Sequence, residues 1–496
     1  MPTTGGYTMS NKAPFFKGFH KLFHGPRRQS VKEKMIAEAR ALQQASLCQL
    51  AQLFSPWIDL QLLSPTAAGA SSRQRDYSIA VTFWAFLVQV ITPNCGCREI
   101  VRKIQGWYAI KKCRIPSEKT GAFCQARKRL PLDTLRAVHE YTARAVNREV
   151  ITDEQWHNRA VKLIDGSCLS MPDTPENQRE FPQPPGQKQG CGFPVVKIVG
   201  CFSLATGALI DWAEGTLKQH ESRLAKSLWH LFHEGDILLT DRGFCSYVNI
   251  ADMWRKGVDS VIRLKTMGKL DWRKGKKLSQ DDRLVVWQKP KYTSVLYTKR
   301  EWKALPDSLT LRLVRCHVNV PGYRTETIFL VTTLTDIAEF TTEDLAQLYL
   351  KRWGVELFYR DIKTTLCMDV LRCKTPDMVR KEIAMHAIAY NLIRAVMQRA
   401  AKNYRVRLNQ ISFKGTVDII RQWHEVFMAV KNQAIQQARI ISVMLEIIAQ
   451  DAVPYRPGRS EPRAVKRRPK NYQRLTNPRH EMVVTPHRNR PVYSTT

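Results

Sequence analysis

The chain has 496 residues, a length that favours two or three compact units with a substantial apolar core. Lysine and arginine outnumber aspartate and glutamate by 78 to 44, which gives a formal net charge of +34. An excess of this size indicates a polyanionic partner, and nucleic acid is the leading candidate. A membrane partner is disfavoured, because the apolar runs are interrupted or far shorter than the ~20 residues of a membrane span.

The start of the chain and the cysteines bear on its compartment. The first ten residues are polar and contain glycine, unlike the basic start and apolar stretch of a signal peptide. The 12 cysteines are scattered and form no paired C-x-x-C units of the zinc-ribbon type. We therefore expect a cytoplasmic protein whose thiols are reduced.

Residues 1–155 are predicted to form a helical N-terminal region that binds DNA. Mixed apolar and charged periodicity marks four helical stretches, at residues 31–54, 79–90, 98–112 and 120–147. Residues 97–130 carry ten lysines or arginines against two glutamates, including the run Arg127-Lys-Arg129. Such a run is either a basic face that contacts the DNA backbone or the solvated side of a helical bundle, and both interpretations stay open.

The pattern changes over residues 156–390, which predict an α/β domain. Short apolar, β-branched runs indicate buried strands at residues 160–164, 195–204, 208–212 and 237–240. Helical stretches at 221–233 and 247–256 alternate with the later strands. Carboxylates at the ends of these strands then become candidates for chemistry.

Residues 255–305 break this rhythm with fifteen lysines or arginines and five acids. Strand-like segments at 284–287 and 294–297 predict a β-rich insertion, at about residues 260–335, on the DNA side. Its three tryptophans are expected to anchor the small core of the insertion rather than to stack on bases: Trp272, Trp287 and Trp302.

The last third of the chain is predicted to be helical and then disordered. A helix is expected over residues 342–367, helical structure over 378–451, and a C-terminal helical region at 391–450. Residues 451–496 contain seven prolines and a net charge of +8, with few residues that could form a core. This composition predicts a basic, disordered tail.

Two aspartates follow apolar runs in the α/β region. Asp165 comes directly after residues 161–164, and the following Gly166 would let the chain turn sharply. Asp241 repeats this arrangement after residues 237–240. Either one alone is usually a turn, but two such positions in one domain favour a functional pair.

A third set of polar residues lies in the predicted helix at 342–367. Tyr349, Arg352, Glu356 and Lys363 stand at offsets of 3, 7 and 14 residues, which are nearly whole turns of one helix. These groups make a poor core face unless they pair with one another or bind something charged. A phosphate and metal site suits all four, because Mg²⁺ takes carboxylate oxygens and two metal ions ~3.5–4 Å apart can stabilise both the attacking and the leaving oxygen.

The spacing Tyr349-x₂-Arg352-x₃-Glu356-x₆-Lys363 resembles the signature of the insertion-sequence-four family of bacterial DDE transposases. Further similarity lies in residues 165–177 and 241–244 and, more weakly, in residues 120–127. The resemblance covers about residues 117–391, most of the folded chain.

The resemblance implies an RNase H-like catalytic core with a β-rich insertion between the second aspartate and the glutamate. It implies that Asp165, Asp241 and Glu356 are catalytic and bind two Mg²⁺ or Mn²⁺ ions. The implied activity is cut-and-paste DNA transposition: binding of the terminal inverted repeats, cleavage, and transfer of the freed strand to target DNA. At least two protomers would act together on double-stranded DNA in the bacterial nucleoid.

By the same resemblance, Tyr349, Arg352 and Lys363 would grip phosphates near the cleaved end, and Trp353 would lie beside a base flipped out of the stack. Arg242 would contact DNA or pair with a catalytic carboxylate. Relatives that form a DNA hairpin place a tryptophan where this chain has Ile328, which leaves the hairpin step open.

The same region offers other candidate residues and other functions. Asp173 is a weaker metal-ligand candidate than Asp165, because Pro172 and Pro175 place it in an extended loop. A metal cluster of histidines with Glu221 is disfavoured: His220, His230 and His233. Alternative functions are an inactive or domesticated DNA-binding relative, and a metal-dependent nuclease without strand transfer.

Overall fold

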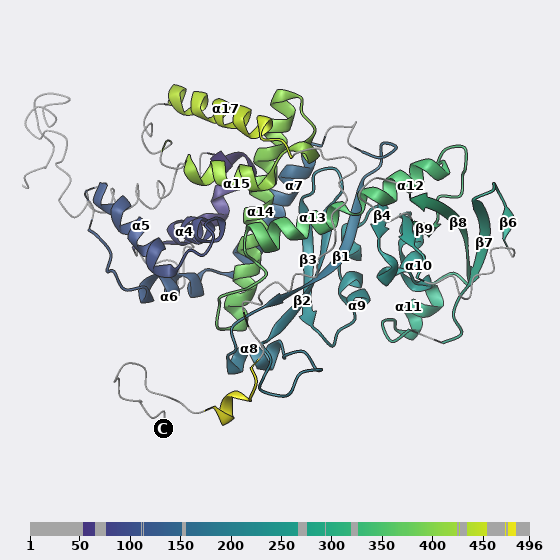
Figure 1. Cartoon of the computed structure of the whole chain (residues 1–496), viewed down its shortest axis with the longest axis horizontal. Coiled ribbons are helices and arrows are strands. Elements are labelled where there is room, and N and C mark those ends of the chain that lie inside the picture. Colours follow the sequence, from purple (N-terminus) through teal and green to yellow (C-terminus); the bar gives the residue numbers. More distant parts are fainter. Residues whose placement is uncertain are drawn as a thin grey trace, which may run out of the picture.

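Figure 1 shows the computed structural model of the chain, in which helices surround one large sheet. The structure describes residues 53–64, 76–110, 112, 114–150, 155–265, 275–292, 294–318, 326–423, 426, 434–453, 472 and 475–482. Most of the helix expected at 31–54, and Trp272, lie outside the described residues. Among the residues described, no helix is both long and apolar enough to cross a membrane.

The strands form one nine-stranded sheet in the order β3-β2-β1-β4-β5-β9-β8-β7-β6. Strands β1, β2 and β3 pair antiparallel, whereas β4 and β5 run parallel to β1. This is the order and direction of an RNase H-like core, and it confirms the predicted α/β fold class. The strand bounds are β1 (Val161–Ser170), β2 (Val195–Ser203), β3 (Leu209–Thr216), β4 (Ile237–Thr240), β5 (Asp259–Arg263), β6 (Lys276–Lys277), β7 (Asp282–Gln288), β8 (Ser308–Val318) and β9 (Glu326–Thr332).

The inserted strands β6 to β9 extend this sheet, because β9 pairs antiparallel with β5. The strand-like segment predicted at 294–297 is instead a turn that leads into α11 (Lys299–Ala304). Thr298 and Glu301 form a capping box there, which favours a helix start over a strand. Trp302 packs with its ring 6.3 Å from that of Tyr297, consistent with a role in the core of the insertion.

The N-terminal helices are α4 (Ile79–Ile91), α5 (Cys97–Ile110), α6 (Gly121–Arg129) and α7 (Leu132–Arg148). The single stretch predicted at 120–147 is divided at Pro131, which precedes the first residue of α7 and has no N–H to continue α6. Arg127 turns inward and donates to Cys97 Sγ at 3.4 Å and Gln89 Oε1 at 3.1 Å. Arg127 is therefore engaged within the helical region, and neither interpretation of the basic run applies to its guanidinium.

Helices cover both faces of the sheet. One face packs against α7 and α14 (Pro376–Tyr404), and the other against α9 (Glu221–Lys226) and α10 (Tyr247–Arg255). Alternate residues of β1 point to these two cores, Leu163 to the first and Ile164 to the second. Two further helices, α15 (Phe413–Gln422) and α17 (Ala434–Gln450), contact α14. The helix predicted at 221–233 is shorter, since only α9 and one 3₁₀ turn form there.

Part of the predicted disordered tail packs on the core domain. The ring of Tyr472 stacks on Phe193 at 4.5 Å, and Leu475 N donates to Cys191 O at 3.2 Å. Arg479 pairs with Asp173, just before α8 (Pro175–Glu180). The disorder prediction was wrong for these residues, because an aromatic ring and an arginine find partners that composition does not reveal. Asp173 is thereby engaged in a structural ion pair.

Candidate active site

Asp165 and Asp241 lie side by side at one edge of the paired region of the sheet. The parallel ladder of β1 and β4 ends at the pair Ile164 and Thr240, where Thr240 Oγ1 donates to Ile164 O at 2.8 Å. Asp165 directly follows Ile164, and Asp241 directly follows Thr240. They share a face of the sheet with Leu163, because alternate residues of a strand point the same way.

The two aspartates differ in their backbone setting. Asp241 directly follows β4, as predicted, and caps the 3₁₀ turn Arg242–Phe244, its Oδ1 accepting from Gly243 N at 2.8 Å. Asp165 does not end β1, which continues to Ser170 against β2. The prediction of a sharp turn at Gly166 was therefore wrong. Gly166 instead leaves room for Glu221, since an added Cβ would lie 2.8 Å from Glu221 Cδ.

Negative charge accumulates at this edge. The pKa of the Asp165 carboxyl is raised to about 6, mainly by burial and also by the charges of Asp241 and Glu221, while the Gly166 N–H and Arg352 oppose the shift. Glu221 reaches the edge from α9, on the opposite face of the sheet. Repelling carboxylates at a partly buried edge have the donor chemistry that a divalent cation requires.

The helix predicted over 342–367 is interrupted twice. It consists of α12 (Thr342–Lys351), α13 (Gly354–Arg360) and a π turn at Asp361–Thr365. Between α12 and α13 the backbone tightens, with Arg352 N donating to Tyr349 O at 3.1 Å and Glu356 N to Trp353 O at 3.2 Å. Gly354 weakens the helix at this point. Such mid-helix irregularities often occur at functional sites.

The predicted stripe of four residues nevertheless faces the end of β1. Tyr349 is buried, which raises its pKa to about 12, and the charge of Asp241 acts on it in the same direction. Arg352 Nη2 lies 3.3 Å from Glu356 Oε1. Lys363 Nζ donates to Ser167 Oγ at 2.9 Å and to Cys168 O at 3.1 Å, a short distance along β1 from Asp165.

Tyr359 is a site residue that the sequence analysis missed. Its hydroxyl donates to Asp165 O at 2.9 Å and accepts from Gly200 N at 2.9 Å, so it ties α13 to β1 and β2. The signal was available, since Tyr359 follows Glu356 by three residues and shares its helix face. Tyrosine is also an ordinary residue for a helix that packs on a sheet, so the pattern alone did not single it out.

The three predicted catalytic carboxylates do not form an assembled cluster. Within the described ranges, no three side chains of His, Cys, Asp or Glu are arranged to hold one metal ion. The carboxylate of Glu356 is turned to Arg352, while Asp165 and Asp241 accept backbone N–H bonds. The structure thus brings the two aspartates together and places the glutamate on the helix above them, engaged by an arginine.

The remaining candidates lie apart from this group. Arg242 is exposed beside Asp241, and Trp353 is 45% exposed on a different side of α13. Ile328 is buried in β9, where it pairs with Cys316. The histidines are separately engaged: His220 caps α9, His230 bonds Ser227 O at 2.8 Å, and His233 lies 3.8 Å from Asp236.

Comparison with known proteins points to one class. Residues 156–392 match a family model described as a transposase DDE domain. The chain is 26% identical over 426 residues to the transposase InsG of insertion sequence element IS4 from Escherichia coli (strain K12), covering 84% of this chain and 92% of that protein. It is 32% identical over 71 residues to the Escherichia coli transposase of IS421, covering 14% and 19%.

Among solved structures, the piggyBac transposase synaptic complex with hairpin DNA matches with a TM-score of 0.39 and 10% identity, over 82% of this chain and 84% of that one. The family match and the sheet order define the class: the protein is a DDE transposase. Within that class it belongs to the insertion-sequence-four family.

Proposed function

We propose that this protein catalyses cut-and-paste DNA transposition by binding the terminal inverted repeats of its element, cutting at the ends and joining the freed strands to target DNA. The observation that carries the proposal is the placement of Asp165 and Asp241 at the end of one parallel ladder, beneath the helix that bears Glu356. Asp165, Asp241 and Glu356 are the proposed catalytic residues.

The same three carboxylates would hold divalent metal, two Mg²⁺ or Mn²⁺ ions in the proposed site. The donor set fits, because it offers carboxylate oxygens from separate elements and the mutual repulsion at Asp165 is relieved by a cation. When bound, the metal supplies Lewis-acid activation of the attacking oxygen and stabilises the leaving oxygen. Glu356 would hold the cation in place of its contact with Arg352, and the Arg352 guanidinium would then be available to a phosphate.

The neighbouring residues would orient the DNA. Tyr349, Arg352 and Lys363 are proposed to contact phosphates close to the scissile bond, since all three face the end of β1. Arg242 is exposed beside Asp241 and is proposed to contact the backbone. Trp353 offers an exposed ring on which a displaced base could stack. Two or more protomers are proposed to act together, because paired cutting requires both ends of the element to be held in one complex.

Cleavage of DNA that carries the element's ends tests this proposal. With Mg²⁺, the wild-type chain should cut and join, while Asp165→Asn, Asp241→Asn and Glu356→Gln should bind the same DNA and leave it intact. The matched control is Asp173→Asn, whose carboxylate pairs with Arg479 outside the site and which should still cut. Full cutting by all three variants would overturn the assignment, and cutting without joined products would indicate a nuclease.

A further inference from the structure

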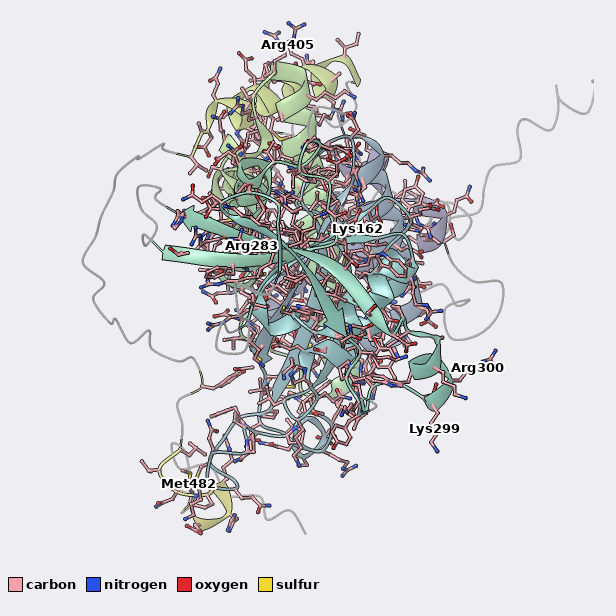
Figure 2. The ribbon with its side chains drawn as sticks, turned by 90° about the vertical axis from the view of Figure 1, so that its right-hand side faces the viewer. Lys162, Arg283, Lys299, Arg300, Arg405 and Met482 are labelled. Atoms are coloured by element: carbon pink, nitrogen blue, oxygen red, sulfur yellow. The ribbon has the colours of Figure 1, made fainter. Side chains whose placement is uncertain are left out.

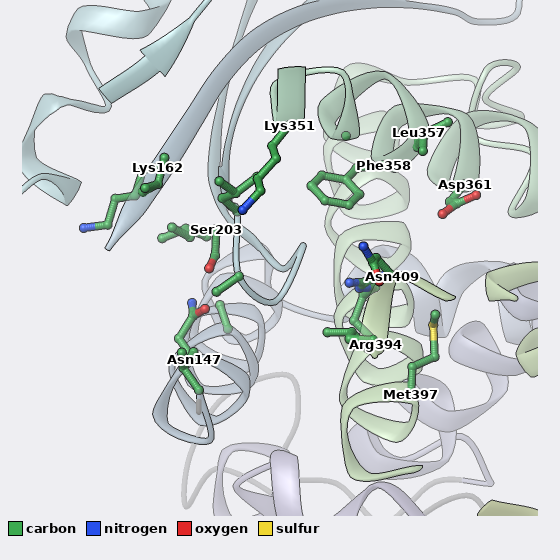
Figure 3. A pocket seen from close by; sticks show the side chains of 18 of the residues that line it. Asn147, Lys162, Ser203, Lys351, Leu357, Phe358, Asp361, Arg394, Met397 and Asn409 are labelled. Atoms are coloured by element: carbon green, nitrogen blue, oxygen red, sulfur yellow. The ribbon is translucent and has the colours of Figure 1, made fainter. Parts of the chain in front are cut away.

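A large cleft lies on the other side of α13 from the candidate catalytic carboxylates. Its volume is about 2190 Å³, and its walls come from α7, the start of β1, α13, α14 and the segment 407–414. Figure 3 shows labelled side chains gathering around it from separate elements, among them Lys351 at the end of α12, Phe358 on α13 and Arg394 on α14. Drug-sized ligands occupy sites of ~300–1,000 Å³, so the cleft suits a polymer better than a small molecule.

We propose that this cleft binds a single-stranded segment of DNA. The proposal rests on the proposed function, because it takes DNA as the substrate, and it adds a second contact surface for that substrate. Helix α13 separates the two surfaces: Trp353 and Leu357 line the cleft, whereas Glu356 and Tyr359 do not.

The charge of the lining favours a polyanion. Ten lysines or arginines line the cleft against three acids, Glu140, Asp211 and Asp361. Several of the inner cations are satisfied by the protein itself; Arg136 lies 3.1 Å from Asp211, and Arg394 donates to Thr206 O at 2.8 Å. Six others are exposed: Arg144, Arg148, Lys351, Arg360, Arg407 and Lys414.

The exposed cations come from different elements. Arg148 is on α7, Lys351 ends α12, and Arg407 lies between α14 and α15. A basic run on one helix is ordinarily explained as the solvated side of that helix. This explanation does not account for cations that come together from three separate elements. Among the described residues none of these three forms an ion pair, whereas Arg144 pairs with Glu140 and Lys414 with Asp418. They are thus available for phosphate oxygens.

The apolar lining distinguishes a single strand from a duplex. Trp353 is 45% exposed and Leu357 is 40% exposed, and both line the cleft with Phe358. A duplex presents sugars and phosphates outward and would gain little from these groups. Unpaired bases stack on aromatic side chains while their backbone follows a basic groove. Exposed apolar side chains beside exposed cations in one cleft therefore fit an unpaired strand.

The salt dependence of DNA binding tests the proposal. Binding of a fluorescent oligothymidine and of a hairpin duplex of equal charge would be measured by anisotropy on the full chain with Asp165→Asn, which prevents cutting. Adding Arg148→Ala, Lys351→Ala and Arg407→Ala should lower the slope of log affinity against log salt for the single strand by about 2, since each phosphate contact contributes roughly 0.7. The duplex slope should change less.

One control and one further test accompany this variant. Lys299→Ala, Arg300→Ala and Lys303→Ala remove the same charge from α11, where Figure 2 shows Lys299 and Arg300 projecting at the tip of the insertion, and should leave the single-strand slope unchanged. Trp353→Ala should weaken single-strand binding roughly tenfold, and Trp353→Phe should restore most of it.

An unchanged slope in the cleft variant, an equal loss for the duplex, or an equal loss in the α11 variant would overturn the proposal. Its failure is separable from failure of the proposed function. The cutting assay with the carboxylate variants decides the latter, because none of Asp165, Asp241 and Glu356 lines the cleft.

Discussion

The two halves of the sheet hold the glutamate-bearing helix pair in different ways. The inserted half contacts the start of α12 through a buried ion pair, in which Arg312 Nε donates to Asp282 Oδ1 at 2.7 Å. Thr342 Oγ1, at the first residue of α12, donates to the other oxygen of the same carboxylate at 2.6 Å. The core half holds α13 through the neutral hydroxyl of Tyr359. A charged anchor is rigid but costly to break, whereas a neutral one can be removed while the fold survives.

The largest effect is expected on the inserted side. Arg312→Ala leaves the fully buried Asp282 carboxylate without its cation and should lower the free energy of unfolding by about 3–5 kcal/mol. Urea unfolding measures this loss. Arg315→Ala is the matched control, because its partner Asp281 is partly exposed and the loss should be about 1 kcal/mol or less. Equal losses in the two variants would contradict the distinction between a buried anchor and an exposed pair.

A smaller effect on the free energy of unfolding, a gain rather than a loss, is expected at Asp165, where the β1–β4 ladder ends. The folded-state pKa of Asp165 is raised to about 6, so this carboxyl favours the fold below its ordinary pKa, near 4, and that contribution is lost as the pH rises through 6. Asp165→Asn should therefore stabilise the metal-free chain at pH 8, by on the order of 2 kcal/mol, and change little at pH 4.

Urea midpoints in a chelating buffer at both pH values check this prediction. Asp307→Asn, at a fully exposed side chain, should show no such difference between the two pH values. A gain from Asp165→Asn that is the same at pH 4 and pH 8 would exclude the proposed ionisation as its cause.

The smallest change in stability is expected at the neutral anchor. Tyr359→Phe removes the bonds to Asp165 O and Gly200 N and should cost about 1–2 kcal/mol of unfolding free energy. DNA cleavage should fall by at least tenfold, because α13 is then less well placed over Asp165. Tyr390 lies in α14, away from the site, and donates to Gly207 O between β2 and β3; Tyr390→Phe should show a similar stability loss with little loss of cleavage. Equal cleavage losses would show that Tyr359 acts through stability alone.

The sequence predicted best those segments whose burial follows a regular pattern along the chain. The run before Asp241 is buried at every position, and its strand ends where the apolar residues end. The backbone irregularities left four residues on one side of the helix: Tyr349, Arg352, Glu356 and Lys363. The tightened turn is followed by a widened one, so their angular shifts largely cancel. Features that follow local periodicity could therefore be predicted.

Features that depend on partners distant in the sequence could not be predicted. β1 continues beyond Asp165 because β2 supplies hydrogen bonds there, although the apolar run has already ended at Ile164. Arg127 is drawn inward by Cys97 and Gln89, which no charge pattern reveals. The contact of Glu356 with Arg352 likewise depends on side-chain geometry, so the spacing gave the members of the site without their pairing.

Metal-specific rescue tests the central claim most directly. Replacing a carboxylate ligand with a thiolate disfavours hard Mg²⁺ more than softer Mn²⁺. Cleavage of end-bearing DNA by Asp165→Cys and Asp241→Cys would be compared in the two metals, with Asp173→Cys as control. Loss of cutting in Mg²⁺ with partial recovery in Mn²⁺, for the two site variants alone, is the predicted result. Full cutting in Mg²⁺ by either site variant would contradict the assignment of Asp165 and Asp241 as metal ligands.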